Sequence, residues 1–167
     1  MSNLSFKEVN ELLPDKGVEL KEEDLSELEK EILAYQSPPG APENLNPHDF
    51  GSYAEMVSCK FLLKIGWRIL HKNWRTAFGE VDIIARDSHG HLVFIEVKGR
   101  KDTRLSSPEE FVDKRKQEQY IKLASYYLAR SDNPQEELRF DVIGLSIHDA
   151  EHLNLRYVLN AFEADGY

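Results

Sequence analysis

The stretch 79–98 limits the possible folds most, because it consists of two short apolar strands around a tight turn. Residues 81–85 and 92–97 are rich in β-branched side chains, and Ser88-His89-Gly90 lies between them. Short β-branched runs on either side of a glycine-containing turn predict a β-hairpin. These strands nevertheless carry several charged side chains, and the charges need a physical explanation.

Pairing that is symmetric about His89 places Asp82 opposite Glu96 and Glu80 opposite Lys98. Alternate residues of a strand point the same way, so the four charged groups should share one face of the hairpin. The opposite face is then predicted to be core, and it comprises Val81, Ile83, Ala85, Val93, Ile95 and Val97.

Two interpretations of the charged face remain open. In one, the face is solvated and Glu80 pairs with Lys98, which contributes about 0.2–1 kcal/mol. In the other, a divalent cation takes an oxygen from Asp82 and from Glu96, because two opposed carboxylates repel each other and raise each other's pKa. Oxygen ligands favour Mg²⁺ or Mn²⁺ over zinc. Lys98 beside such a cation is typical of phosphodiester hydrolysis, in which an ammonium group positions water or stabilises developing charge.

The order of predicted elements indicates an α/β sandwich with a mixed sheet. We expect a helix at 48–65, strands at 67–75 and in the hairpin, a helix from Ser107 to Arg130, and strands at 138–147 and 153–159. Residues 1–47 form a separate acidic extension with a short helix and a proline-rich linker, and 48–167 form the main domain.

Charge is distributed unevenly along the 167 residues. The net charge is −9, but residues 1–47 carry eleven acidic against four basic side chains, whereas 60–122 carry fourteen basic against nine acidic ones. The middle of the chain is therefore suited to contact with a phosphate backbone.

The sequence has neither an apolar run long enough to span a membrane nor a secretory signal pattern, so we expect a cytoplasmic protein. The single cysteine, Cys59, is expected to be a buried apolar residue.

Several motifs together resemble the YraN family, which consists of predicted endonucleases related to archaeal Holliday junction resolvases. The motifs are Gly51-Ser52-Tyr53-Ala54-Glu55, Gly66-Trp67-Arg68-Ile69-Leu70 with Asn73, residues 79–85, residues 93–98, and Arg139-Phe140-Asp141-Val142. The resemblance covers about 48–162 and places the chain in the PD-(D/E)xK superfamily. It implies a restriction-endonuclease-like α/β/α sandwich of order α-β-β-β-α-β-β, a divalent-metal site and a nucleic-acid substrate.

The resemblance also assigns roles to individual residues. Asp82 and Glu96 would be metal ligands and Lys98 the catalytic lysine, with Glu55 an additional carboxylate at the metal. Glu80 would lie beside the site and hold Lys98 in place. The cofactor is expected to be Mg²⁺ or Mn²⁺.

Other residues are candidates for contact with nucleic acid. Lys116 and Gln117 match family positions on the helix after the core motif, and a solvated helix turn explains them equally well. Arg75, Arg100, Lys101 and Arg104 are candidates for phosphate contacts or are ordinary surface charges. His89 and His91 share a face near the turn, but two histidines on a loop seldom form a metal site, and we predict none there.

Three functions follow as hypotheses. The first is a metal-dependent nuclease that cuts structured or single-stranded DNA in repair or recombination, with RNA also open as a substrate. The second is a non-catalytic nucleic-acid-binding module of the same fold, which the acidic N-terminal helix recruits to a partner. The third makes residues 1–47 an arm that docks on a protein partner or on the chain's own basic groove. Resolvase relatives act as dimers, which leaves a homodimer open.

Overall fold

The computed structural model describes residues 4–5, 22–35, 44–101, 112–149 and 152–163. The elements in chain order are β1 (Leu4–Ser5), a 3₁₀ turn (Glu22–Asp24), α2 (Glu27–Ala34), α3 (Pro47–Lys64), β2 (Arg68–Thr76), β3 (Gly79–Arg86), β4 (Leu92–Arg100), α4 (Lys114–Leu128), β5 (Leu138–Asp149) and β6 (His152–Phe162). The predicted order of one helix, three strands, one helix and two strands is found from α3 to β6.

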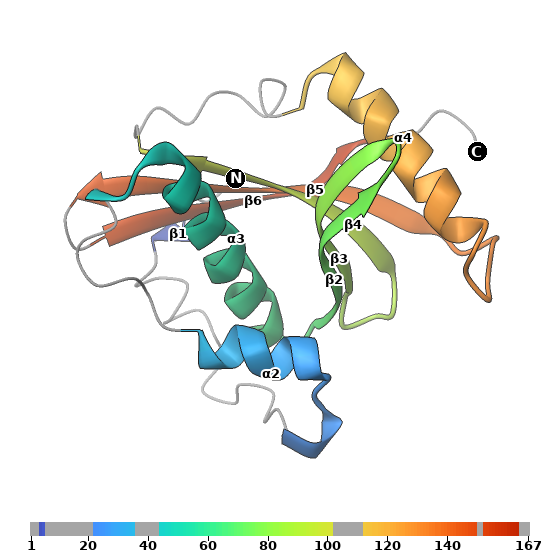
Figure 1. The fold of residues 1–167 in the computed structure, drawn as a ribbon, viewed down its shortest axis with the longest axis horizontal. Coiled ribbons are helices and arrows are strands. Elements are labelled where there is room, and N and C mark those ends of the chain that lie inside the picture. Colours follow the sequence, from blue (N-terminus) through green and yellow to red (C-terminus); the bar gives the residue numbers. More distant parts are fainter. Residues whose placement is uncertain (1–3, 6–21, 36–43, 102–111, 150–151, 164–167) are drawn as a thin grey trace.

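One mixed sheet lies at the centre of the molecule, with strand order β1-β6-β5-β4-β3-β2. Helices α2 and α3 cover one face and α4 packs on the other, as Figure 1 shows. Strand β3 is antiparallel to both β2 and β4, β4 and β5 are parallel, and β6 returns antiparallel to β5. The expected α/β sandwich with a mixed sheet is thus confirmed.

Local capping explains where the helices begin. Asn46 caps α3 by accepting the Asp49 N–H at 2.9 Å, and Pro47 occupies the first turn, where its missing N–H is not needed. Asp113 caps α4 by accepting the Lys116 N–H at 2.8 Å. The prediction of one helix from Ser107 is therefore wrong, because Val112 and Asp113 are not helical. Residue Ser107 itself lies outside the described part of the chain.

The register of the hairpin agrees with the prediction as far as the pairing extends. Ile83 lies opposite Ile95 and Arg86 opposite Leu92, so the turn is centred on His89. The pairing of β3 with β4 ends at Ile83 and Ile95, whereas β4 stays paired with β5 as far as Arg100. The two strands therefore separate at the point where Asp82 and Glu96 lie.

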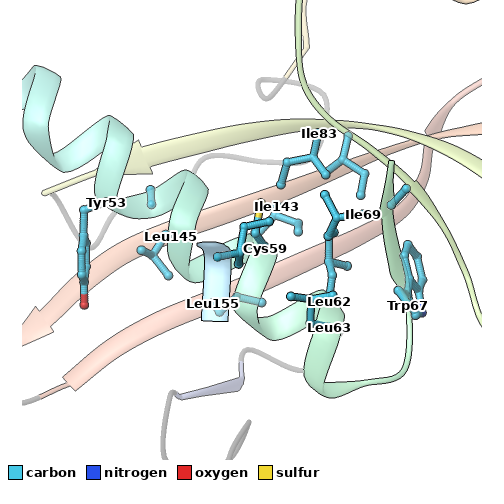
Figure 2. Close-up of a cluster of buried hydrophobic side chains, with 14 of the residues drawn as sticks. Tyr53, Cys59, Leu62, Leu63, Trp67, Ile69, Ile83, Ile143, Leu145 and Leu155 are labelled. Atoms are coloured by element: carbon cyan, nitrogen blue, oxygen red, sulfur yellow. The ribbon is translucent and has the colours of Figure 1, made fainter. Parts of the chain in front are cut away.

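Two hydrophobic cores lie on the two faces of the sheet. Figure 2 shows the core under α3, in which Cys59 and Leu62 of the helix pack against Ile69, Ile83 and Ile143 of three strands. Cys59 is fully buried, and burial raises the pKa of its thiol to about 12, which confirms its expected apolar role.

The second core lies under α4 and contains Val81, Ile84 and Phe94. The prediction that Val81 shares a face with Ile83 is wrong, because Ile83 belongs to the core under α3. The alternation of side chains along β3 thus breaks next to Asp82.

In the described segments, none of the helices combines the length and apolar character that crossing a lipid bilayer requires.

Candidate metal and nucleic-acid site

Asp82 occupies the point where β3 leaves β4. Its Oδ2 accepts the Val97 N–H at 2.7 Å, so this carboxylate replaces the strand partner that β4 loses there. A buried N–H needs an acceptor, and the side chain supplies one. The same bond fixes the direction of the Asp82 side chain relative to β4.

Glu96 is buried, and three side chains hold its carboxylate. Lys98 Nζ lies 2.6 Å from Oε1, and Lys116 Nζ of α4 lies 3.1 Å from Oε2. The Tyr120 hydroxyl, also on α4, donates to Oε2 at 2.5 Å. Burial alone would raise the pKa of Glu96, but the two ammonium groups and the tyrosine hold it below its ordinary value.

The pKa of Asp82 is shifted in the opposite direction to that of Glu96. Burial, and next the negative charge of Glu96, raise its pKa to about 7, and Glu55 adds to the effect. The Val97 N–H and the ammonium of Lys116 counteract this rise only in part. Asp82 therefore lacks the close cation partners that Glu96 has, although it is buried.

Glu55 reaches the site from α3, on the other face of the sheet. Its Oε2 lies 3.6 Å from Lys72 Nζ of β2, and both side chains are about four-fifths buried. Three carboxylates, Glu55, Asp82 and Glu96, thus meet three lysines, Lys72, Lys98 and Lys116.

This set of donors is suitable for a hard divalent cation. It offers carboxylate oxygens alone, and the raised pKa of Asp82 shows that a positive charge would be favourable there. The three carboxylates are spread more widely than a closed cage, because they are not among the groups whose ligand atoms all lie within 4.8 Å in the described residues. An open arrangement leaves coordination positions for water and substrate.

Glu80 differs from its predicted role. The expected pair with Lys98 does not form, because the β3–β4 pairing has ended and the two residues no longer lie opposite each other. The β2–β3 register places Arg75 opposite Glu80, and the two side chains form an ion pair of 2.9 Å. Lys98 instead pairs with Glu96, two residues earlier on its own strand.

The remaining candidates separate into three groups. Lys116 reaches Glu96, whereas the Gln117 amide donates to the Val112 carbonyl at 3.0 Å and supports the helix start. Arg100 and Lys101 are exposed at the end of β4. Arg104 lies outside the described residues.

Two residues of the site were not predicted to belong to it. Tyr120 is one of them, and its spacing of four from the candidate Lys116 places both side chains on one face of α4. Lys72 is identified only by the β2–β3 register, which sets it opposite Ile83, next to Asp82.

A second polar cluster lies at the turn of the hairpin. Asp87, His89 and His91 have ligand atoms within 4.8 Å of one another and could hold a metal ion. The Asp87 carboxylate, however, already accepts the N–H groups of His89 and His91 at 2.9 Å, His91 Nδ1 at 3.0 Å and Arg139 Nη1 at 3.0 Å. These bonds outweigh the effect of burial and lower the pKa of Asp87.

Arg139 connects this cluster to the buried Asp141. Its Nε lies 3.0 Å from the Asp141 carboxylate, which also accepts the Tyr157 hydroxyl at 2.5 Å and the Asn160 N–H at 2.8 Å. The motif Arg139-Phe140-Asp141-Val142 thus provides a bonded network that joins Asp87 at the turn to Tyr157 and Asn160 of β6.

Taken together, these features define an α/β protein with a mixed sheet and a cluster of buried carboxylates and lysines where two strands separate. The chain belongs to the uncharacterised protein family UPF0102, whose model matches residues 54–145. The resemblance to the YraN family is thereby confirmed.

Relatives in this family match most of their own length. A UPF0102 protein of Chlorobium phaeobacteroides is 39% identical over 121 residues, which are 70% of this chain and 95% of the relative. One from Caldanaerobacter subterraneus is 37% identical over 123 residues, 72% of this chain and 99% of the relative. A third, from Symbiobacterium thermophilum, is 40% identical and covers 68% of this chain and 96% of the relative.

Two solved structures show distant similarity. A repair endonuclease from Pyrococcus abyssi has a TM-score of 0.37 at 20% identity, over 59% of this chain and 39% of that chain. SfsA of Pyrococcus furiosus, in complex with Ca²⁺, has a TM-score of 0.32 at 15% identity, over 65% of this chain and 62% of that chain. The chain thus spans less than two thirds of the length of either protein.

Proposed function

We propose that this protein is a divalent-metal-dependent nuclease that hydrolyses phosphodiester bonds in DNA and acts on structured or single-stranded substrates in repair or recombination. The observation that carries the proposal is the position of Asp82 and Glu96, which lie where β3 and β4 separate, with Lys98 Nζ 2.6 Å from Glu96. The raised pKa of Asp82 supports it, since that carboxylate lacks a sufficient positive partner.

The three carboxylates Glu55, Asp82 and Glu96 would hold the Mg²⁺ or Mn²⁺ ion. When bound, such an ion polarises a phosphate and lowers the pKa of a water molecule. Lys98 would supply an ammonium group that stabilises the negative charge on the phosphoryl oxygens in the transition state. The Val97 N–H and the Tyr120 hydroxyl hold Asp82 and Glu96 in place through direct hydrogen bonds.

The test is incubation of the purified protein with flap, fork, junction and single-stranded DNA in Mg²⁺ or Mn²⁺. We expect cleavage by the natural protein and a loss of about 10²–10³-fold in Lys98→Ala, because one electrostatic stabiliser of the transition state is removed. Asp82→Ala should lose cleavage as well. Lys64→Ala is the matched control, because this lysine is exposed at the end of α3. Cleavage that survives both site changes would refute the proposal.

A second candidate is a non-catalytic nucleic-acid-binding module with the same fold. It is favoured by one observation, the pairing of both Glu96 oxygens with lysines, which neutralises this carboxylate without any ion. In that case, DNA binding should weaken steeply with salt and no metal concentration should produce strand scission. A metal titration that follows binding and DNA integrity in the same samples distinguishes the two functions.

In this second proposal, the acidic N-terminal helix recruits the module to a protein partner. Helix α2 buries Ile32 in the core under α3, while Glu27 and Glu31 on its other side are exposed. This exposed acidic side is the surface that a basic protein partner would contact.

A further inference from the structure

A hollow of about 470 Å³ lies between the β2–β3 turn and the first half of α4. Phe78 of the turn forms one wall, and Arg115, Lys116, Gln119 and Lys122 of α4 line the rest. Its volume lies within the range of about 300–1,000 Å³ that is usual for small-ligand sites. It is therefore large enough for a short piece of a polymer strand but does not have the dimensions of a duplex-binding face.

The hollow adjoins the carboxylate cluster through one shared residue. Lys116 belongs to both, because it lines the hollow and its Nζ lies 3.1 Å from Glu96 Oε2. The Gln119 amide donates to the Phe78 carbonyl at 3.1 Å, so the turn is fixed against α4 and the hollow has defined walls. A ligand in the hollow would therefore lie beside the lysine that holds Glu96.

The charge of the hollow favours an anionic ligand. Three basic side chains, Arg115, Lys116 and Lys122, oppose the two acidic ones, Asp113 and Glu118. The Asp113 carboxylate already accepts the Lys116 N–H at 2.8 Å as the cap of α4. Lys116 is engaged with Glu96, so Arg115 and Lys122 are the basic groups of the hollow that are placed to contact a phosphate backbone.

Phe78 adds an aromatic surface to this basic hollow. Its side chain is 51% exposed, which is unusual for a phenylalanine, and its ring meets Tyr126 edge-on at 5.4 Å. Tyr126 thus supports the ring and leaves part of it accessible. Basic side chains interleaved with an accessible aromatic ring are the combination that binds unpaired nucleic-acid strands.

We propose that this hollow holds a single-stranded segment of DNA that leads into the carboxylate cluster. Arg115 and Lys122 bind its phosphates, and Phe78 stacks on one of its bases. The proposal rests on the nuclease function above and narrows its substrate to DNA with an unpaired segment at the cut. A base within a duplex is already stacked between its neighbours and cannot present its face to Phe78.

The test measures binding without cleavage, by fluorescence anisotropy in EDTA with a labelled single-stranded oligonucleotide and the same sequence as a duplex. Stacking of one base contributes about 1–3 kcal/mol, so Phe78→Ala should weaken single-strand binding about 5- to 150-fold and leave duplex binding unchanged. Phe78→Trp should retain the binding, because it keeps an aromatic face. Leu159→Ala is the matched control, since this side chain is 62% exposed on β6, away from the hollow.

The outcomes separate this inference from the proposed function. Equal single-strand affinity of Phe78→Ala and the natural protein overturns the inference, even if cleavage still depends on Lys98. Loss of affinity in Phe78→Ala together with failure of Mg²⁺ and Mn²⁺ to support cleavage keeps the single-strand site and rejects the nuclease. A parallel loss of duplex binding also overturns the inference, because Phe78 would then not recognise unpaired bases.

Discussion

Asp82 lies within strand β3 and Asp87 directly follows that strand, and their carboxylates have opposite electrostatic environments. Asp87 accepts four hydrogen bonds, including one from Arg139, and its pKa is lowered. Asp82 accepts one bond, from the Val97 N–H, and burial together with Glu96 raises its pKa to about 7. An aspartate thus has a full set of hydrogen-bond donors at the turn and only one donor where β3 and β4 separate.

The difference indicates which polar cluster stabilises the fold and which is available for chemistry. At the turn, each carboxylate has its own donors, so a metal ion would have to displace Arg139 or His91. Where β3 and β4 separate, the lysines neutralise Glu96 and leave Asp82 underpaired. Perturbed carboxylates of this kind concentrate at functional sites because stability alone does not favour them.

Removal of the positively charged Arg139 side chain, which contacts Asp87 at the turn, should have the largest effect on stability. Arg139→Ala leaves the buried Asp87 and Asp141 without their common positive partner, and we expect a loss of about 3–5 kcal/mol in the free energy of unfolding. Urea denaturation measures this change. Arg139→Lys should lose less, because it keeps the charge. A loss below about 1 kcal/mol in Arg139→Ala would show that the cluster is not structural.

Removal of the Asp82 charge should raise stability, in contrast to the removal of Arg139, because the ionised form of Asp82 destabilises the folded state. Its pKa is raised on folding, so the natural protein loses stability as the pH rises from about 4 to 7. Asp82→Asn keeps an acceptor for the Val97 N–H and removes the charge. We expect it to be about 2 kcal/mol more stable than the natural protein at pH 8 and equally stable below pH 4. A variant that is less stable at pH 8 would contradict this account.

Metal binding should stabilise the natural protein by a smaller amount. At ten times its dissociation constant, an ion that binds only the folded state contributes about 1.4 kcal/mol. We expect Mg²⁺ or Mn²⁺ to raise the melting temperature of the natural protein and of His91→Ala, and to have little effect on Asp82→Asn. The reverse pattern would place the ion at Asp87, His89 and His91 instead.

Loss of the ion pair between Arg75 and Glu80 should have the smallest effect on stability. Their ion pair is exposed on the Arg75 side and links β2 to β3 outside both clusters. Arg75→Ala should therefore change the free energy of unfolding by no more than about 0.5 kcal/mol, as measured in urea. A larger loss would mean that Glu80 contributes to the site through this pair.

The register of the hairpin was predictable because it follows from local sequence. The turn at Ser88-His89-Gly90 fixes the pairing, and the period of two along each strand then sets Ile83 opposite Ile95. The end of that pairing was not predictable, since it depends on β4 remaining paired with β5, a strand that lies about 40 residues later in the chain. The early end of the β3–β4 pairing accounts for two wrong predictions. These are the assignment of Val81 to the face of Ile83 and the pairing of Glu80 with Lys98.

The composition of the site was predictable only in part. The pattern of the hairpin indicates Asp82, Glu96 and Lys98, because they lie on neighbouring strands, whereas Glu55 of α3 was expected only from the family resemblance. Lys116 and Tyr120 come from α4, and their contacts with Glu96 depend on how that helix packs on the sheet. The start of α4 shows the same limit, since Ser107 and Asp113 are both good helix caps and tertiary structure selects Asp113.

The carboxylate of Glu29 has a consequence for the solubility of the folded chain. It lies on α2, outside residues 54–145 that the family model matches, and accepts both the Arg68 guanidinium and the Ile69 N–H at 2.9 Å. Strand β2 forms one edge of the sheet, where an unpaired N–H invites another chain to add a strand. Glu29 occupies that donor and thereby protects this edge against pairing between molecules.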